Sequence, residues 1–257
     1  SGICYGRMGV STQVYGALCQ WLIGVINIAT GNIDKPGGSM FTLPAVDQIH
    51  NTSTGGFGRH RSRVRGLPEF DREIPASTLA EEITTPGEGQ VRALFTGAGN
   101  PVLSTPNGRQ LDSALEQLEF MVSLDPYINE TTRHADIILP PTSQLEHDHY
   151  DIGFHTHAIR NTTRFNEPVF DKPQDSLHDW EIFTALGDRV AQAMGLEPRP
   201  PRAPHEIIDA GLQVGPYSEN RGSEHALSLD VLRANPSGID LGALVPMLPE
   251  RLFTPDK

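Results

Sequence analysis

A glycine-rich loop that follows a short apolar run is the first part of the sequence that could bind a ligand. The run VRALFT, residues 91–96, leads directly into GAGNP, residues 97–101. Glycines at the end of a strand let the backbone approach a ligand closely and present N–H groups to phosphate oxygens. The third glycine of the NAD-binding fingerprint would fall where this chain has Val102. Because the next helix is expected to begin only near residue 106, we predict a wider loop than the tight NAD-binding turn.

Polar side chains also follow the next two apolar runs. EFMVSL, residues 119–124, ends at Asp125, and ADIIL, residues 135–139, is followed by PPTS, residues 140–143. In an open parallel sheet, ligands bind at the carboxyl ends of the strands, where an acidic residue can take up ribose hydroxyls. A carboxylate can also accept the two parallel hydrogen bonds that the N1–H and N2–H₂ edge of guanine offers. A plain turn and a helix-capping aspartate fit the same residues, so both interpretations stay open.

Strands that alternate with helices must position these loops. The three apolar runs predict three adjacent parallel strands with helical crossovers between them. Parallel strands with continuous apolar runs are covered on both faces. We therefore predict an α/β fold: a three-layer, Rossmann-like parallel sheet with helices on both faces, together with irregular loops.

Periodicity of apolar residues places the helices. It predicts helices over 12–30, 177–194 and 205–213. The first is apolar on more than one side, so we expect it to be buried on most sides, with Ser11 or Thr12 capping its start and Gly31-Asn32 ending it.

Two of the helices have core faces that the sequence specifies. The helix after Thr105 and Pro106, which serve as N-cap and first residue, would bury Leu111, Leu115 and Leu118. The core side of 177–194 would consist of Trp180, Phe183, Leu186, Val190 and Met194.

Two regions show weaker patterning. Residues 46–90 have little periodicity and are expected to form a long surface excursion within a cofactor-binding region that spans 1–197. Within it, RHRSRVR at 59–65 packs four arginines into seven residues, which is either a solvated loop or an anion-attracting rim. Prolines interrupt 198–257 repeatedly, so we expect a mostly irregular linker there.

A histidine-rich stretch gives a weaker hypothesis. His147, His149, His155 and His157 would share one face if they lay on a single strand, and could then hold a metal ion. Surface histidines are the alternative. The chain has no Cys-x-x-Cys, so the usual four thiolates of an iron–sulfur cluster are absent from it.

Composition excludes some functions. The net charge of −12 argues against nucleic-acid binding, which needs a basic face. Two cysteines, Cys4 and Cys19, indicate a reducing compartment, so we expect a cytoplasmic location. The longest apolar stretch, at 21–29, is too short to span a bilayer.

Several stretches together resemble one enzyme family. YGRMGVSTQVYG from residue 5, TGNIDKPGG from residue 30, LFTGAGNPVLS from residue 94 and the run from Val122 to Asp151 are similar to the bis-molybdopterin guanine dinucleotide oxidoreductases of molybdenum and tungsten. Dimethyl sulfoxide reductase, formate dehydrogenase and nitrate reductase belong to that family. The resemblance implies a middle part of a larger subunit, with 198–257 leading to a further cofactor-binding domain.

The resemblance also implies a cofactor and its contacts. The ligand would be a molybdenum-bound bis(molybdopterin guanine dinucleotide), used for two-electron redox or oxygen-atom transfer with a small-molecule substrate and an electron-transfer partner. The residues it places at the cofactor are Gly6, Arg7, Met8, Gly9, Gln13, Gly97, Gly99, Asn100, Pro101, Asp125 and Thr142. A glycine loop near Pro36–Gly38 would lie towards the pterins.

Other parts of the family pattern are not found here. The metal-ligand residue and an iron–sulfur domain lie upstream of this kind of segment, so we expect no redox activity from this chain alone. Formate-oxidising members carry an arginine in the loop that matches 31–45, and this chain has none there, which argues against formate. The alternatives are an NAD-type dehydrogenase domain, which Val102 disfavours, and a non-catalytic module whose histidines bind metal.

Overall fold

The computed structural model describes residues 2–47, 56–198, 200–248 and 252. The chain forms two compact units, each made from separate stretches of sequence. Unit 1 comprises Ser1–Asp47, His149–Glu167 and His205–Lys257, and unit 2 comprises Gln48–Asp148 and Pro168–Pro204. No described helix is both long enough and apolar enough to span a membrane.

A parallel sheet lies at the centre of unit 2. Its strands are β3 (Ala93–Gly97), β4 (Phe120–Leu124) and β5 (Ile137–Leu139), in the order β3-β4-β5. Both pairs of strands are parallel, so the prediction of three adjacent parallel strands is confirmed and the fold is α/β.

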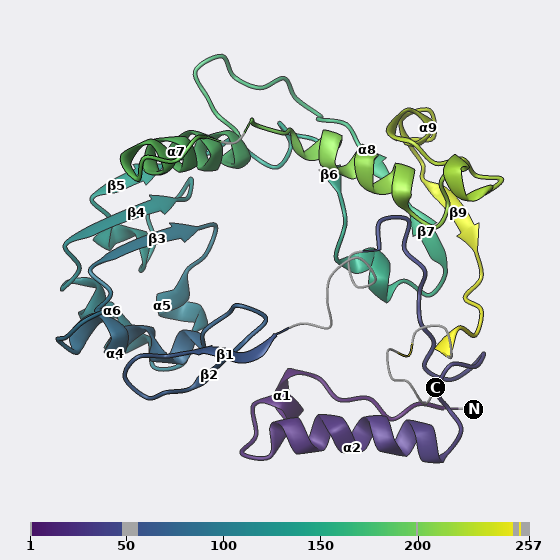
Figure 1. Cartoon of the computed structure of the whole chain (residues 1–257), viewed down its shortest axis with the longest axis horizontal. Helices are drawn as coiled ribbons and strands as arrows, with labels where there is room; N and C mark the ends of the chain where they lie inside the picture. The colour runs from purple at the N-terminus through teal and green to yellow at the C-terminus, as the bar shows by residue number, and fades with distance from the viewer. Residues whose placement is uncertain (1, 48–55, 199, 249–251, 253–257) are drawn as a thin grey trace. The chain divides into compact units, whose positions relative to one another are not determined.

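Helices contact this sheet through two separate apolar clusters. Met121 packs with residues of α4 (Leu79–Thr84) and α6 (Gly108–Leu115), whereas Val122 and Leu124 pack with Ile182 of α7 (Asp179–Ala193). Alternate residues of a strand point to opposite faces, so the two clusters lie on opposite sides of β4. Figure 1 shows α7 on one side of the strands and α4 and α6 on the other.

The crossover after β3 differs from the prediction. A one-turn helix, α5 (Pro101–Ser104), follows the GAGNP loop at once, and Thr105 is its C-cap and not the N-cap of the next helix. The helix α6 begins at Gly108, which lies so close to the carbonyl oxygen of Val102 that a Cβ at this position would clash with it. This tight packing lets the chain reverse between α5 and α6. The predicted core face is confirmed for Leu111 and Leu115, which are buried.

The core side predicted for α7 is partly wrong. Ile182 is the buried residue of this helix, while Val190 and Met194 are exposed. Phe183 is 48% exposed and lies beside Phe95, with 5.7 Å between the ring centroids. Periodicity alone does not decide between the two faces, because residues four apart, such as Ile182 and Leu186, and residues seven apart, such as Phe183 and Val190, both share one side of a helix. Contact with β4 and β5 selects Ile182 and Leu186.

Residues 46–90 contain regular structure where a long surface excursion was expected. The described part holds β1 (Phe57–Arg61), which pairs antiparallel with β2 (Pro68–Phe70), a 3-10 turn η1 (Ala76–Thr78), and α4. Ile83 of α4 is fully buried. These elements are too short to show periodicity, and their burial comes from contacts with residues distant in sequence. Residues 48–55 lie outside the described part.

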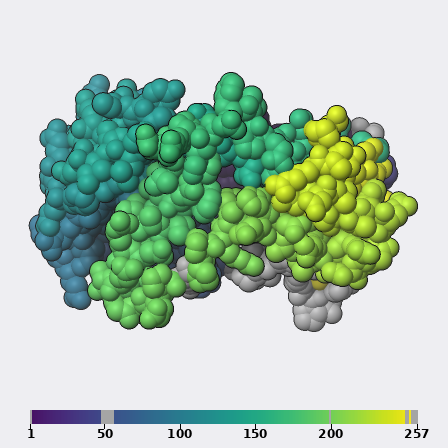
Figure 2. Space-filling view, turned by 90° about the horizontal axis from the view of Figure 1, so that it is seen from above, coloured from purple at the N-terminus to yellow at the C-terminus, as the bar shows by residue number. Residues whose placement is uncertain are grey.

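Unit 1 contains most of the region that was expected to be an irregular linker. In its described residues the strands form two antiparallel pairs, β6 (His149–Tyr150) with β8 (Phe165–Asn166) and β7 (Asn161–Thr163) with β9 (Ile239–Gly242). The helices α8 (Pro204–Val214) and α9 (Leu229–Arg233) follow, and α8 agrees with the predicted helix near 205–213. The core consists of Ala45, Phe165, Ile208, Leu212, Leu227, Leu229, Leu232 and Leu241. Figure 2 shows the yellow-green atoms of the described residues after 204 close together, in agreement with this core.

The N-terminal helical region of unit 1 is divided and exposed. A short α1 (Met8–Ser11) precedes α2 (Gly16–Ala29), so neither Ser11 nor Thr12 caps α2. The predicted end is correct, because Gly31 has φ 62° and its N–H and that of Asn32 bond the last turn. The expectation of burial on most sides is wrong within unit 1, where the apolar residues Leu18, Trp21, Leu22, Ile26 and Ile28 are all exposed.

An ion cluster of partly exposed side chains in unit 2 gives an expected dependence of stability on acid pH. The Asp112 carboxylate contacts His134 Nε2 and Arg133 Nη2, each at 2.7 Å, and these hydrogen bonds, that of His134 first, lower the pKa of Asp112. Since the folded pKa is below the unfolded value of about 4, this stabilisation is present above pH 4 and is lost as the pH falls through the folded pKa.

We expect Asp112→Asn to lower the free energy of unfolding at pH 6 and to reduce its change between pH 5 and pH 3, roughly the titration range of an ordinary carboxylate. Urea unfolding at a series of pH values measures both effects. Asp175→Asn removes an exposed carboxylate of the same unit and is the control. Equal pH profiles for the two variants would contradict the assignment.

Candidate functional site

The carboxyl ends of the three parallel strands lie level with one another. Gly97 pairs in register with Leu124, and Leu124 pairs with Leu139. The loops that follow these residues therefore leave the same edge of the sheet. This is the edge at which open α/β sheets bind ligands, so the predicted loops are brought together as the sequence indicated.

Hydrogen bonds join the loop after β3 to the turn after β4. Asn100 Oδ1 accepts a hydrogen bond from Thr131 Oγ1 at 2.7 Å, and Asn100 Nδ2 donates to Glu130 Oε2 at 2.7 Å. Thr131 Oγ1 in turn accepts from the Val102 N–H at 3.1 Å, and Thr131 is fully buried. The hydrogen bond from Asn100 is the main cause of the lowered pKa of Glu130. These contacts fix the Asn100 side chain. Thr131 was not among the predicted site residues, because its partner is 31 positions away.

The Asp125 carboxylate is engaged in the turn that follows it. Its Oδ1 accepts from the Tyr127 N–H at 2.8 Å and its Oδ2 from Asn129 Nδ2 at 3.3 Å. The same Asn129 accepts the N–H groups of Thr131 and Thr132 through Oδ1, at 3.0 Å each. The hypothesis that Asp125 reads guanosine required this carboxylate to stay clear of the turn, and that condition is not met. A carboxylate has about four lone-pair sites, and these two bonds leave the others for a ligand.

The backbone of the GAGNP loop has an unusual conformation. Ala98 has φ 50°, a left-handed conformation that is uncommon for a residue with a side chain, and its N–H donates to the Leu124 carbonyl at 2.9 Å. In the described part of the chain, the N–H groups of Gly99 and Asn100 donate no hydrogen bond. A Cβ on Gly99 would meet nothing closer than 3.7 Å. The loop thus offers two N–H groups that no acceptor of the described residues occupies.

The loop after β5 is held to the start of α7. Thr142 N–H donates to the Leu177 carbonyl at 3.0 Å, and Thr142 Oγ1 lies 2.6 Å from His178 Nδ1. His178 caps α7, and its ring stacks near Trp180. His178 was not predicted, because the helix predicted over 177–194 placed this residue inside the helix, whereas α7 begins at Asp179.

Phe183 brings an aromatic ring to the end of β3. A Cβ on Gly97 would lie 3.2 Å from Phe183 Cζ, which is tighter than ordinary van der Waals contact. Packing against this ring therefore favours a glycine at position 97.

The site residues predicted near the N-terminus lie in unit 1. The backbone carbonyl of Arg7 accepts hydrogen bonds from the N–H groups of Val10 and Ser11. Met8 and Gly9 belong to α1, and Gln13 Nε2 donates to the Gly9 carbonyl at 2.9 Å. The residues of the strand-end loops lie in unit 2. Each of these two sets of residues forms its hydrogen bonds within its own unit.

The strand that the histidine hypothesis required is not formed. His149 lies in β6, whereas His155 and His157 lie in the 3-10 turn η3 (Phe154–His157). Among the described residues, no group of three or more histidine, cysteine or acidic side chains could hold a metal ion. The four histidines would share one face only if 147–157 were a continuous strand, and the 3-10 turn at 154–157 interrupts the extended structure.

Comparison with known proteins identifies the class. The parallel pairing of β3, β4 and β5 places unit 2 in the α/β class. The family model described as molybdopterin oxidoreductase matches residues 3–189, and the chain belongs to this family.

Two relatives show how much of a longer enzyme the chain covers. The assimilatory nitrate reductase catalytic subunit of Bacillus subtilis is 27% identical over 212 residues, which are 75% of this chain and 29% of that protein. The alpha subunit of a formate dehydrogenase of Methanococcus maripaludis is 23% identical over 209 residues, 73% of this chain and 30% of that protein. The chain therefore spans less than a third of the length of these relatives.

Proposed function

We propose that this chain is the part of a molybdenum- or tungsten-dependent oxidoreductase that binds the guanosine and pyrophosphate arm of a bis(molybdopterin guanine dinucleotide). Membership of the molybdopterin oxidoreductase family supports the cofactor class. The observation that carries the assignment to this edge is the loop of Gly99 and Asn100, which follows the level strand ends and whose two N–H groups donate no hydrogen bond within the described part of the chain. N–H groups that donate to nothing else suit phosphate oxygens.

In this proposal each strand-end loop contacts a different part of the ligand. The loop from Gly97 to Asn100 would hold the pyrophosphate, and Thr131 would keep that loop in place through Asn100. Asp125 would accept donors of the guanosine with the lone pairs that the turn leaves unused. Thr142 would close the site from the third strand end. The three-layer, Rossmann-like arrangement belongs to this proposal, supported by the two clusters on either side of β4.

We extend the proposal to the reaction of the whole enzyme. When bound, the metal cofactor supplies two-electron redox or oxygen-atom transfer for a small-molecule substrate. We place its metal-ligand residue, an iron–sulfur cluster and the electron-transfer partner outside this chain, and the residues from Gly6 to Gln13 towards the pterins. A cytoplasmic location and the limits 1–197 and 198–257 stay predictions.

The experiment that tests the site measures cofactor retention in the whole oxidoreductase. Asp125→Ala should lower the molybdenum and guanine content, because hydrogen bonds to a charged group contribute about 1.5–3 kcal/mol each. Asp125→Asn should be intermediate, since its amide oxygen still accepts while its NH₂ group faces donors. Equal cofactor content in all three proteins would leave Asp125 a structural residue of the turn. Tighter binding of NAD than of guanine nucleotides would contradict the proposal as a whole.

A further inference from the structure

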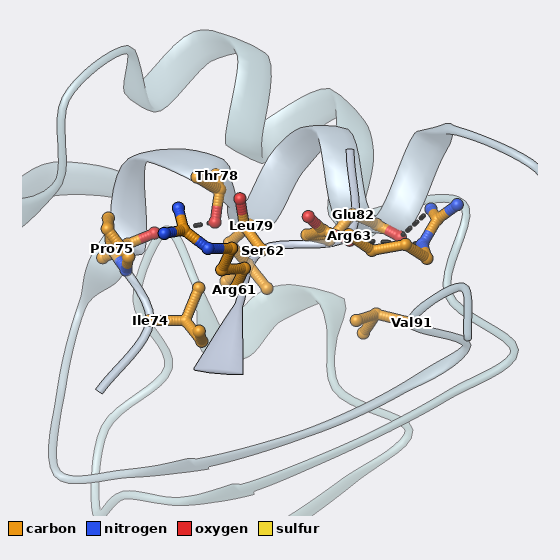
Figure 3. Close-up of a pocket in the computed structure, with 10 residues that line it drawn as sticks. Arg61, Ser62, Arg63, Ile74, Pro75, Thr78, Leu79, Glu82 and Val91 are labelled. Atoms are coloured by element: carbon orange, nitrogen blue, oxygen red, sulfur yellow. Dashed lines mark hydrogen bonds and ion pairs between the residues drawn. The ribbon is translucent and has the colours of Figure 1, made fainter. Parts of the chain in front are cut away.

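A cavity lies in unit 2, and its lining includes none of the strand-end loops. It has a volume of about 380 Å³ and is lined by residues from the end of β1, from η1 and from α4, none of which belongs to the loops described above. Figure 3 shows the lining side chains. Small-molecule pockets have volumes of about 300–1,000 Å³, so the cavity is large enough for a small ligand.

Most of the lining is apolar. Ile74, Pro75, Ala76, Leu79 and Val91 contribute hydrocarbon surface. The two hydroxyl groups of the lining are already bonded: Ser62 Oγ accepts from the Leu67 N–H at 2.9 Å, and Thr78 Oγ1 donates to the Pro75 carbonyl at 2.8 Å. The pocket thus offers an apolar surface, and its two hydroxyl groups need no hydrogen bond from a ligand.

The charges of the lining do not cancel. Arg63 Nε lies 3.3 Å from Glu82 Oε2, and Glu82 also accepts the Val64 N–H, so this pair is neutral as a whole. Arg61 donates to the backbone carbonyl of Gly66 at 2.8 Å, and no carboxylate of the described chain forms an ion pair with it. The lining therefore carries a net charge of one positive unit.

The other arginines of the 59–65 stretch do not compete for a ligand here. Arg59 pairs with Glu69 and Arg65 with Glu81. The predicted anion-attracting rim is thus reduced to one guanidinium. Figure 3 shows the Arg61 guanidinium extending towards Pro75 and Thr78 above Ile74, while Arg63 and Glu82 lie near Val91 at the other end of the pocket.

We propose that this pocket binds a small amphipathic monoanion, a carboxylate with a hydrocarbon or aromatic body. Arginine has five N–H donors in a fixed fork that matches a carboxylate, and only one donor contact of Arg61 is made within the chain. The body of the ligand would cover Ile74, Leu79 and Val91. A dianion would bring its second charge towards Glu82, and a cation would meet Arg61, so a single negative charge fits best. The site is independent of the cofactor site proposed above.

The test uses three probes with the same hydrocarbon body: hexanoate, 1-hexanol and hexylamine. Nuclear magnetic resonance titration of the 257-residue chain should show saturable shifts of the Ala76 and Leu79 amides with hexanoate, weaker binding of hexanol and none of hexylamine. Arg61→Gln should raise the Kd of hexanoate by about tenfold or more, which corresponds to loss of one charged hydrogen bond. Ala76→Phe should abolish binding by filling the pocket, and Ala76 is exposed, so the fold should tolerate it.

Arg109→Gln is the matched control, because Arg109 is exposed on α6 and does not line the pocket. It should leave the Kd of hexanoate unchanged. Hexanol that binds as tightly as hexanoate would show an apolar pocket without preference for an anion and would overturn the proposal. Absence of saturable shifts at Ala76 and Leu79, or equal binding by the chain with and without Arg61→Gln, would overturn it as well.

Discussion

Thr131→Val should lower the free energy of unfolding by about 2–4 kcal/mol, because it leaves the Val102 N–H and Asn100 Oδ1 without their hydrogen-bond partner in a buried place. Valine has nearly the shape of threonine, so the loss is of the hydroxyl and not of volume. Urea unfolding of the chain measures the stability. In the whole oxidoreductase, the same substitution should lower cofactor content, since Asn100 and its loop are no longer fixed.

Thr132→Val is the matched control for this substitution. Thr132 is equally buried, and its hydroxyl accepts the Asn129 N–H and donates to the Tyr127 carbonyl, so it stabilises the turn without reaching the loop after β3. It should cost stability too, but it should leave cofactor content closer to normal. A double-mutant cycle between Thr131→Val and Asn100→Ala should give a coupling energy of about 0.5–3 kcal/mol. Additive effects of the two substitutions would show that the link does not hold the loop.

The sequence predicts the sheet of unit 2 well, because each of its strands is an apolar run bounded by polar or glycine residues. Parallel strands buried on both faces leave this signal even in a single sequence. The end of α2 was also predictable, since Gly31 adopts a positive φ that favours glycine. The grouping of the three loops follows from the same rule, because parallel strands put their carboxyl ends at one edge.

Contacts between distant residues account for what the sequence did not predict. Thr131 fixes Asn100 across 31 positions, and no local pattern marks either partner. Asp125 could be expected both at a ligand and in a turn, and the choice depends on where Tyr127 and Asn129 point their donors. The burial of α4 depends on residues near 111–121, which become neighbours only once the sheet has formed.

Ile83→Ala tests whether α4 belongs to the core of unit 2, although it lies in a stretch without clear periodicity. Ile83 is fully buried and packs in one cluster with Leu111, Leu115 and Met121. Truncating a buried isoleucine removes apolar contact and leaves a cavity, which costs about 2–5 kcal/mol in the free energy of unfolding. Ile128→Ala is the control, because Ile128 is 79% exposed in the same unit and its truncation should cost about 0.5 kcal/mol or less. Urea unfolding of both variants measures the difference. If the two substitutions cost the same, α4 would be a surface attachment, and the sheet would be stabilised on that face by α6 alone.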